Sequence, residues 1–193
     1  PGWFTLPGSS HQFRDWKKTG HGIMNLHDAV VQSCDVYFYK LAVAMEVDAM
    51  KKFLEPFGFG AKTGVDLQNE SEGLLPSVAW KKARGQPWYP GETVITGIGQ
   101  GSVLVTPLQL ATATAVLANH GVRLKPRLVR ATVDAKTQAA RETVPETAGQ
   151  ITLKKKEHLD IQIRNLMDVV HTNKGTAYGI GYNAPYKIAG KTG

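Results

Sequence analysis

The longest regular pattern in this sequence is an apolar stripe within residues 153–171. Five apolar residues recur there at helical spacing, namely Leu159, Ile163, Leu166, Met167 and Val170. Such a stripe predicts a helix that buries one face and exposes the other. Asn173 and Gly175 follow the stripe, and both residue types are common where helices end. We therefore expect the best-defined helix of the chain to lie near its C-terminal end.

A second helix start is equally well marked at residues 106–109, which read Thr-Pro-Leu-Gln. Thr at the N-cap, Pro at the first helical position and Gln three residues after the Thr form a capping box. We expect this helix to reach about His120 and to stop at Gly121. Caps and prolines predict three more helices: from Asn25 to about Gln32, from Val36 to Glu46 with Asp35 as the cap, and over residues 48–55 before Pro56.

The remaining segments are punctuated by Gly and Pro or alternate weakly between apolar and polar residues. Residues 1–22 are expected to be a loop, and residues 56–105 to be long loops with short strands. Residues 122–150 predict strands or an exposed excursion, and residues 186–193 predict a short strand. Helices mixed with short strands in this way indicate a mixed α/β (α+β) fold.

Composition limits the domain count and the partners. A chain of 193 residues, 42% of them hydrophobic, can bury one core, so we expect one domain or a large piece of one. The net charge of +7 favours an anionic substrate or surface, but the basic residues are scattered. Their densest cluster, Lys154-Lys155-Lys156, is typical of a solvated face, and no basic stripe is interleaved with aromatic residues. We therefore expect no nucleic-acid partner. No window approaches the roughly 18–20 apolar residues of a membrane span.

Two short segments hold residue types that carry chemistry. Ser33-Cys34-Asp35 lies between two predicted helices, where Ser and Asp commonly act as caps. Lys191-Thr192-Gly193 follows a strand-like pattern, where a charge, a hydroxyl and a residue without a side chain would suit a carboxylate lying along the strand. A second copy, Lys62-Thr63-Gly64, lies in a Gly-rich loop, so we expect its Lys62 to be a solvated surface group.

The order of several short segments is more informative than any one of them. The chain carries Ser33-x-Asp35, G-I-G-Q-G at 97–101, T-P-L-Q-L-A at 106–111, A-N-H-G at 118–121, G-T-A at 175–177 and A-G-K-T-G at 189–193. This series resembles the transpeptidase domain of the class B penicillin-binding proteins. The sequences of residues 14–22, 88–93 and 97–101 are most similar to the class B proteins that act in cell elongation of rod-shaped Gram-negative bacteria. The resemblance covers nearly the whole chain and implies the fold shared with serine β-lactamases, an antiparallel sheet flanked by helices.

The resemblance also shows what this chain lacks. The nucleophile of the family is the Ser of an S-x-x-K motif. None of the six serines (Ser9, Ser10, Ser33, Ser71, Ser77 and Ser102) has a Lys three residues later. We therefore expect residues 1–193 to be part of one transpeptidase domain. The S-x-x-K region would lie upstream of Pro1, further strands would follow the K-T-G, and the chain alone would be inactive.

The resemblance implies serine acyl transfer onto D-Ala-D-Ala stem peptides, with no catalytic cofactor and with β-lactams as inhibitors. Ser33 would belong to the proton relay, Lys191 would supply positive potential, and Thr192 with Gly193 would bind the terminal carboxylate. Asp35 stands where many relatives have Asn, so a contact that needs an amide donor is in doubt. G-I-G-Q-G lacks the G-K-[S/T] ending of a phosphate loop and is expected to form a tight loop behind the site.

The resemblance further implies a location and partners. We expect the periplasmic face of the bacterial inner membrane, with membrane contact only through an N-terminal anchor outside this chain. A SEDS-type glycosyltransferase and other elongation-complex proteins are the implied protein partners. Two alternatives stay open at this point: a β-lactam-sensing domain of a signalling receptor, and a basic binding module without catalysis. An S-x-x-K upstream of Pro1 would exclude the second of these.

The single cysteine, Cys34, lies between two residues of the implied site. Free Cys is often simply a small buried hydrophobic residue. However, Asp15 and His21 precede it in a Gly-flanked loop with little apolar content. Carboxylate, imidazole and thiolate are the three common zinc-ligand types. We therefore predict that Asp15, His21 and Cys34 bind a structural zinc, with a fourth ligand from upstream of Pro1 or from water. His11 and His27 are alternative ligands, although His27 is expected to face solvent.

Overall fold

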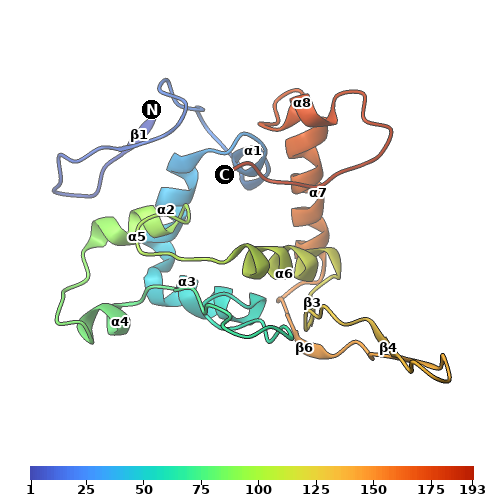
Figure 1. The fold of residues 1–193 in the computed structure, drawn as a ribbon. Coiled ribbons are helices and arrows are strands. Elements are labelled where there is room, and N and C mark those ends of the chain that lie inside the picture. Colours follow the sequence, from blue (N-terminus) through green and yellow to red (C-terminus); the bar gives the residue numbers. More distant parts are fainter. The chain divides into compact units, whose positions relative to one another are not determined.

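The structure is a computed structural model that describes residues 1–193, and its residues group into two compact units. The first unit comprises residues 1–51, 76–103 and 155–193, and the second comprises residues 52–75 and 104–154. Each unit is therefore built from segments that lie far apart in the sequence, as the colours in Figure 1 show.

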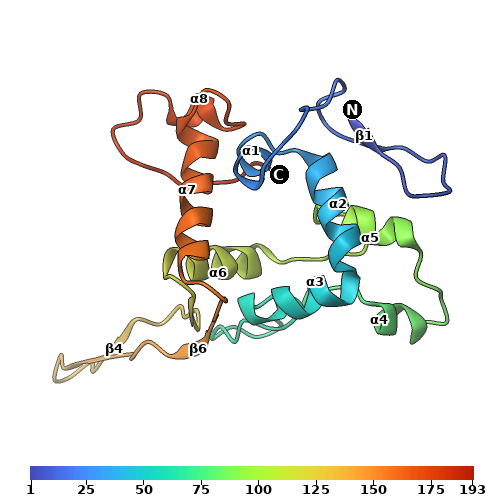
Figure 2. The same ribbon diagram turned by 180° about the vertical axis from the view of Figure 1, so that it is seen from behind.

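The first unit is mainly helical. Its helices are α1 (Leu26–Val31), α2 (Asp35–Met45), α4 (Val78–Lys82), α5 (Pro90–Thr96), α7 (Glu157–His171) and α8 (Tyr178–Gly181), and α3 (Val47–Leu54) begins in it. Two short strands, β1 (Trp3–Phe4) and β2 (Phe13–Arg14), pair antiparallel. Helix α1 packs against α7, and α2 packs against α5. The C-terminus lies beside α1 in both views (Figures 1 and 2).

Helix α7 confirms the predicted apolar stripe. Leu159 and Val170 are buried, and the stripe residues between them are partly buried. Asn165 and Val169 are buried as well, so the covered face is wider than the stripe. The helix begins at Glu157 rather than at 153, because Lys154–Lys156 precede it as a bend. Three positive charges are unfavourable at the positive end of a helix dipole, which accounts for the later start.

The G-I-G-Q-G segment follows the end of α5 and packs against α2. A side chain at Gly97 would bring its Cβ to 2.4 Å from the Cβ of Ala42, so only glycine allows α5 to pack this closely on α2. Gly99 and Gly101 have φ angles of 74° and 75°, in the left-handed region that favours glycine. The expected tight loop is therefore present, and it packs against the helix that begins at Asp35.

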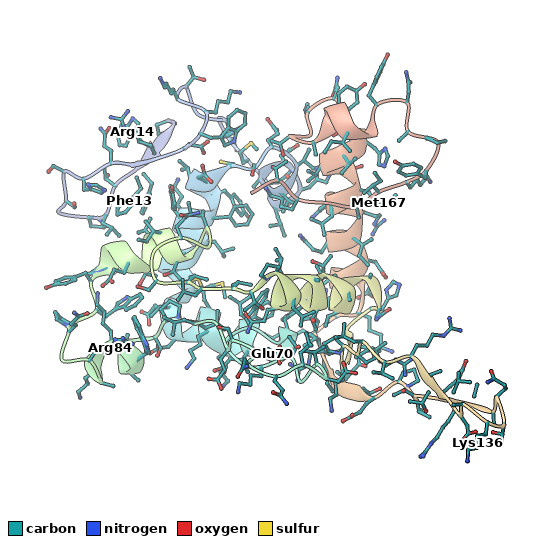
Figure 3. All side chains as sticks on the ribbon, viewed as in Figure 1. Phe13, Arg14, Glu70, Arg84, Lys136 and Met167 are labelled. Carbon is teal, nitrogen blue, oxygen red and sulfur yellow. The ribbon has the colours of Figure 1, made fainter.

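The second unit contains α6 (Pro107–Ala118), the 3₁₀ turn Glu55–Phe57 and two antiparallel strand pairs. The pairs are β3 (Val122–Leu124) with β6 (Thr147–Gln150), and β4 (Ala131–Val133) with β5 (Ala140–Glu142). The β4–β5 hairpin projects away from α6 in both ribbon views, with Lys136 at its tip (Figures 1, 2 and 3). Residues 122–150 thus combine the two predicted outcomes, since they form strands and an exposed excursion.

The predicted capping box begins α6, and its Gln109 side chain also makes tertiary hydrogen bonds. Thr106 Oγ1 accepts from Gln109 N at 3.1 Å, and Gln109 Oε1 accepts from Thr106 N at 3.0 Å. The fully buried Gln109 also donates through Nε2 to the carbonyls of Ala61 and Glu72, each at 2.7 Å. One side chain therefore fixes both ends of the loop that carries Lys62-Thr63-Gly64.

The mixed α/β class is confirmed, with antiparallel strand pairs and flanking helices. Three local predictions are wrong. Residues 1–22 were expected to be a loop, but β1 and β2 pair within them. Helices α4 and α5 interrupt the stretch 56–105 that was expected to hold only loops and strands, although Ser77 and the Tyr89-Pro90-Gly91-Glu92 start are recognisable caps. Residues 186–193 form no strand, because no neighbouring strand pairs with their backbone.

No helix in the structure is both long enough and apolar enough to cross a membrane. The longest, α7, has 15 residues, against roughly 20 for a transmembrane helix.

Candidate active site

Ser33 occupies the sharp turn between α1 and α2. Its φ angle is 55°, a left-handed conformation that is uncommon for a residue with a side chain. The turn is held by bonds from Ser33 N to Val30 O at 3.3 Å and from Cys34 N to Ala29 O at 2.9 Å. Strained residues of this kind persist only where the surrounding contacts fix them, and they concentrate at functional sites.

Asp35 has a different role from the one that its position suggests. We expected it to cap the following helix, but Cys34 is the N-cap residue and Asp35 is the first residue of α2. Its Oδ2 instead accepts a hydrogen bond from Trp16 N at 3.1 Å. The bond ties the N-terminal loop to the motif, so the carboxylate stabilises a tertiary contact in addition to lying in the first turn of α2.

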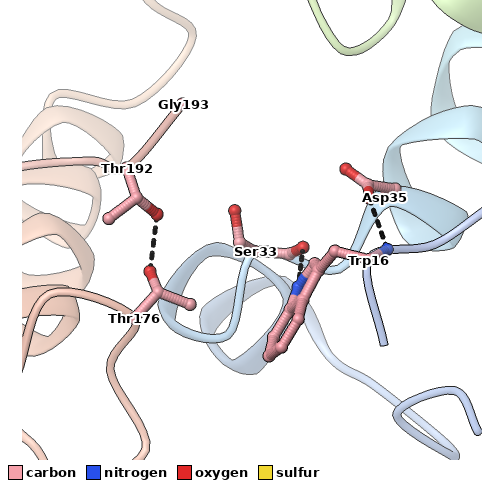
Figure 4. A pocket seen from close by; sticks show the side chains of 6 residues that line it. All are labelled: Trp16, Ser33, Asp35, Thr176, Thr192 and Gly193. Carbon is pink, nitrogen blue, oxygen red and sulfur yellow. Dashed lines mark hydrogen bonds between the residues drawn. The ribbon is translucent and has the colours of Figure 1, made fainter. Parts of the chain in front are cut away.

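Trp16 was not singled out from the sequence, yet it contacts both motif residues. Its indole Nε1 donates to the carbonyl of Ser33 at 2.9 Å and to that of Gln32 at 3.1 Å (Figure 4). The side chain remains 59% exposed. The only sequence signal was a large aromatic residue in the polar stretch Asp15-Trp16-Lys17-Lys18, which is atypical of a solvated loop.

The C-terminal K-T-G meets the interhelical turn. Lys191 Nζ donates to Ser33 Oγ, which is 158 residues earlier in the chain, and to Thr192 O at 2.7 Å. The segment reaches this position because Ile188 N donates to His171 Nε2 at 2.9 Å and Gly190 N to Leu166 O at 3.0 Å. Helix α7 therefore supports the K-T-G without any strand pairing.

Thr192 is paired with Thr176, the hydroxyl residue of the G-T-A segment. Their Oγ1 atoms lie 2.7 Å apart, as the dashed line in Figure 4 marks. When one hydroxyl donates to the other, the second hydroxyl hydrogen remains available for a ligand. Thr176 N also donates to Val31 O at 3.2 Å, which ties this segment to the end of α1.

These side chains line one open pocket of about 430 Å³. Its walls are Trp16, Ser33, Asp35, Thr176, Thr192 and Gly193 (Figure 4). Four of the five predicted catalytic and substrate-binding residues line it directly, and the fifth, Lys191, contacts Ser33. The remaining copy of the motif is elsewhere: Lys62 lies in the second unit and is exposed, as expected.

The two ionisable groups of the site influence each other. Burial lowers the pKa of Lys191, and the negative charge of Asp35 acts in the opposite direction. Burial also raises the pKa of Asp35, against the hydrogen bond from Trp16 and the charge of Lys191. Desolvation thus destabilises both charges, and each charge partly offsets the cost for the other.

Asp15, His21 and Cys34 come together beside the turn. One potential ligand atom from each lies within 4.8 Å of the others. Asp15 Oδ2 is 3.4 Å from His21 Nδ1, and the same oxygen accepts a hydrogen bond from Cys34 Sγ at 3.5 Å. The His21 side chain is 1% exposed, and neither ring nitrogen has a hydrogen-bond partner. A buried imidazole without partners is costly, so the cluster is suited to a group that would complete it.

The alternative histidines do not join this cluster. His27 is 46% exposed and its Nε2 lies 2.9 Å from Asp168 Oδ2, on the side of α1 that faces α7. His11 packs edge-on against the ring of Phe13. Burial raises the pKa of the Cys34 thiol, and the nearby Asp15 carboxylate acts in the same direction.

Comparison with known proteins gives one family throughout. A family profile described as "Penicillin binding protein transpeptidase domain" matches residues 3–193. The chain is 50% identical to the peptidoglycan D,D-transpeptidase MrdA of Acinetobacter baumannii and 37% identical to MrdA of Escherichia coli K12. Both alignments cover all of this chain, but only 28% and 30% of those relatives.

Solved structures agree with the sequence relatives. The crystal structure of Pseudomonas aeruginosa PBP2 in complex with WCK 5153 is 41% identical, with a TM-score of 0.89 over 99% of this chain and 41% of that one. PBP2 of Helicobacter pylori in complex with MreC is 36% identical, with a TM-score of 0.85 over all of this chain and 34% of that one. The chain therefore spans less than half the length of these relatives.

Proposed function

The chain belongs to the penicillin-binding protein transpeptidase family, and we propose that it forms the carboxylate-binding and proton-relay part of a peptidoglycan D,D-transpeptidase active site. The observation that carries this proposal is the contact between Lys191 and Ser33, because it joins the two motifs at one pocket. The two compact units would be parts of one transpeptidase domain, which the match over residues 3–193 supports.

The reaction would be acyl transfer in two steps. A serine from a part of the protein preceding Pro1 attacks the carbonyl carbon of a D-Ala-D-Ala stem peptide. The bond to the terminal D-Ala nitrogen breaks, D-Ala leaves with a proton on that nitrogen, and an acyl-serine ester forms. An amine of a neighbouring stem peptide then attacks the ester, the serine oxygen regains a proton, and the new amide is the crosslink. β-Lactams would stop the enzyme at the first step.

Each residue of the pocket has a task in this scheme. Lys191 supplies positive potential and lies close enough to Ser33 to exchange a proton with its hydroxyl. The Thr176–Thr192 pair offers a hydroxyl hydrogen to the terminal carboxylate. Gly193 lines the pocket without a side chain, so a peptide backbone can lie against it. Trp16 holds Ser33 and Asp35 in place.

Mass spectrometry of the full-length protein after reaction with benzylpenicillin tests this function. We expect one penicilloyl group per chain, on a serine that lies outside residues 1–193 and has a Lys three residues after it. Ser33→Ala should slow acylation by about 100-fold, in the range typical of a lost general acid–base group, and Ser9→Ala in the N-terminal loop should not. An adduct on any of the six serines of this chain would overturn the assignment.

Location and partners follow from the same proposal. The protein would act at the periplasmic face of the inner membrane, through an N-terminal anchor outside these residues. Two related structures support elongation-complex partners: PBP2 of Helicobacter pylori is in complex with MreC, and another relative belongs to a peptidoglycan synthase complex that coordinates polymerization and crosslinking. A fractionation of cells that express the full-length protein should therefore recover it with the inner membrane, and recovery in the cytosol would contradict this location.

We further propose that Asp15, His21 and Cys34 bind a structural zinc. The three ligand types suit zinc, and neither nitrogen of the buried His21 ring makes a hydrogen bond. Tetrahedral zinc at about 2.0–2.3 Å from its ligands places them about 3.5 Å apart, so the cluster needs only a small contraction. Asp15 Oδ2 also accepts from Val36 N at 3.2 Å, so the ion would hold the N-terminal loop onto the Ser33 turn.

Elemental analysis of the full-length protein, purified without chelator, tests the zinc proposal. We expect about one zinc per chain, loss of most of it in Cys34→Ser, and no loss in His27→Ala, whose histidine pairs with Asp168 instead. Cys34→Ser should also unfold at a lower temperature. Absence of metal from the wild-type protein would overturn the zinc proposal and leave Cys34 as a buried hydrophobic residue.

A further inference from the structure

The pocket has two ends of opposite character. At one end stand the hydroxyl groups of Thr176 and Thr192, which suit a carboxylate, and Lys191 adds positive potential through its contact with Ser33. At the other end stands Asp35, whose side chain accepts hydrogen bonds and cannot donate them when ionised. A ligand with a single negative group would use only the first end.

The Asp35 carboxylate is oriented by Trp16. Its Oδ2 atom is occupied by the backbone N–H of Trp16 at 3.1 Å. Figure 4 shows the other carboxylate oxygen turned toward the space between Ser33 and Gly193. A backbone donor from a loop that is itself pinned by the Trp16 indole keeps this orientation fixed. The pocket-facing oxygen is therefore a preformed acceptor.

Lys191 does not occupy that acceptor. Its ammonium group donates to Ser33 Oγ and to Thr192 O, and neither atom belongs to Asp35. The exposed Trp16 side chain lines the pocket beside Asp35, and aromatic rings attract cations over their faces. An anionic acceptor and an indole together favour a positively charged nitrogen.

We propose that Asp35 and Trp16 form a subsite for a cationic nitrogen of the ligand, so that the pocket selects zwitterions with a carboxylate at the Thr176–Thr192 end. The inference rests on the proposed transpeptidase function and specifies its ligand class. Stem peptides that carry a free amine as well as a terminal carboxylate have this chemistry. A ligand that presents only a carbonyl oxygen toward Asp35 would meet two acceptors facing each other.

A matched pair of penicillins tests the subsite. Benzylpenicillin and its α-amino derivative, ampicillin, share the nucleus and the carboxylate and differ by one ammonium group. Their second-order acylation rate constants are measured with the full-length protein, as wild type, Asp35→Asn and Asp48→Asn. The Asp35→Asn side chain keeps an oxygen for the Trp16 N–H but removes the charge. Asp48 is the control, because its carboxylate also accepts a backbone N–H, from Val78 at 3.0 Å, outside the pocket.

We expect wild type and Asp48→Asn to favour ampicillin, and Asp35→Asn to lose about tenfold of that preference, the size of one charge-assisted hydrogen bond. In wild type, the preference should also fall as salt rises, since exposed charges are screened. This second measurement decides the matter if Asp35→Asn fails to fold. Equal ampicillin-to-benzylpenicillin ratios in all three proteins would overturn the subsite. Failure of wild type to react with either penicillin would instead overturn the proposed function.

Discussion

The chain contains the tripeptide Lys-Thr-Gly twice, and the two copies differ in what they bind. At Lys62-Thr63-Gly64, the carboxylate of Glu70 accepts from Thr63 N at 2.7 Å, Thr63 Oγ1 at 2.5 Å and Gly64 N at 3.1 Å. At Lys191-Thr192-Gly193 there is no such acid. The threonine hydroxyl pairs with Thr176, the lysine reaches Ser33, and an open pocket lies in front.

The first copy shows that the backbone and hydroxyl donors of this tripeptide can hold a carboxylate, and we propose the same role for the second copy. The first copy is filled by an acid six residues farther along its own loop, and so it stabilises that loop. Under the proposed function, the second copy offers its donors to a ligand. Context decides between the two roles: the loop of the first copy is closed at both ends by Gln109, whereas the second copy is held by α7 beside a strained serine.

Removing the two lysines should separate the copies most clearly. Lys191→Ala should lower penicillin acylation of the full-length protein by 100-fold or more, in the range of a lost preorganised charge at an active site, about 10²–10³. Lys62→Ala should leave acylation within about twofold, because Lys62 is exposed and surface changes are usually small. Stopped-flow acylation rates measure both. Similar rates in the two variants would mean that the wrong copy has been assigned to the site.

The two threonines should differ in the property that they affect. Thr192→Val should slow acylation about tenfold, because a carboxylate loses one hydroxyl donor. It should lower stability less than Thr63→Val does, because its bond to Thr176 is exposed and joins two neutral groups. Thr63→Val should lower the free energy of unfolding by about 1 kcal/mol through the lost bond to Glu70. Acylation rates and chemical denaturation of the same two proteins test the pair. The account fails here if Thr63→Val slows acylation while Thr192→Val is the more destabilising of the two.

Glu70→Gln should remove a pH-dependent contribution to stability that comes from the Glu70 carboxylate. Desolvation raises the pKa of Glu70, but hydrogen bonds from Thr63 and Gly64 outweigh this effect and hold the pKa below its usual 4.5. A lowered folded-state pKa contributes stability that is complete above the unfolded pKa and lost as the pH falls through the folded one. Wild type should therefore unfold at a higher temperature than Glu70→Gln at pH 7. The gap should shrink below pH 4.5, and a gap that is constant with pH would exclude this linkage.

The smallest expected effect concerns the pH dependence of acylation, through Lys191 of the second copy. Burial lowers the pKa of Lys191 and the charge of Asp35 partly opposes this shift, so Asp35→Asn should lower that pKa further. If acylation needs the Lys191 cation, its alkaline limb should move to lower pH in Asp35→Asn. Asp48→Asn, outside the pocket, is the control and should show no shift. A shift to higher pH in Asp35→Asn would contradict the assigned interaction.

Several parts of the fold were predictable because their signals are local. The Thr106 capping box, the Asn25 cap and the stripe of α7 each depend on residues within one or two turns of helix. The expected strand at 186–193 failed for the opposite reason. A strand needs a hydrogen-bonding neighbour, and local alternation says nothing about whether one is present.

The site was predictable only in part for the same reason. Ser33, Lys191 and Thr192 were recognised from ordered motifs, but the contacts of Trp16 come from a loop 16–19 residues before the turn. Asp35 was mistaken for a cap, because the sequence does not show that a backbone N–H from another segment competes for its carboxylate. The Glu70 contacts were missed although the acid is close in sequence, since loop closure is not visible in composition.

A crystal structure of the full-length protein acylated by benzylpenicillin tests the central claim most directly. The account predicts that the penicillin carboxylate lies within hydrogen-bond distance, about 2.5–3.0 Å, of the Thr192 or Thr176 hydroxyl. Glu70 should still occupy Thr63 and Gly64. A carboxylate bound away from both threonines, with Lys191 turned from Ser33, would contradict the account.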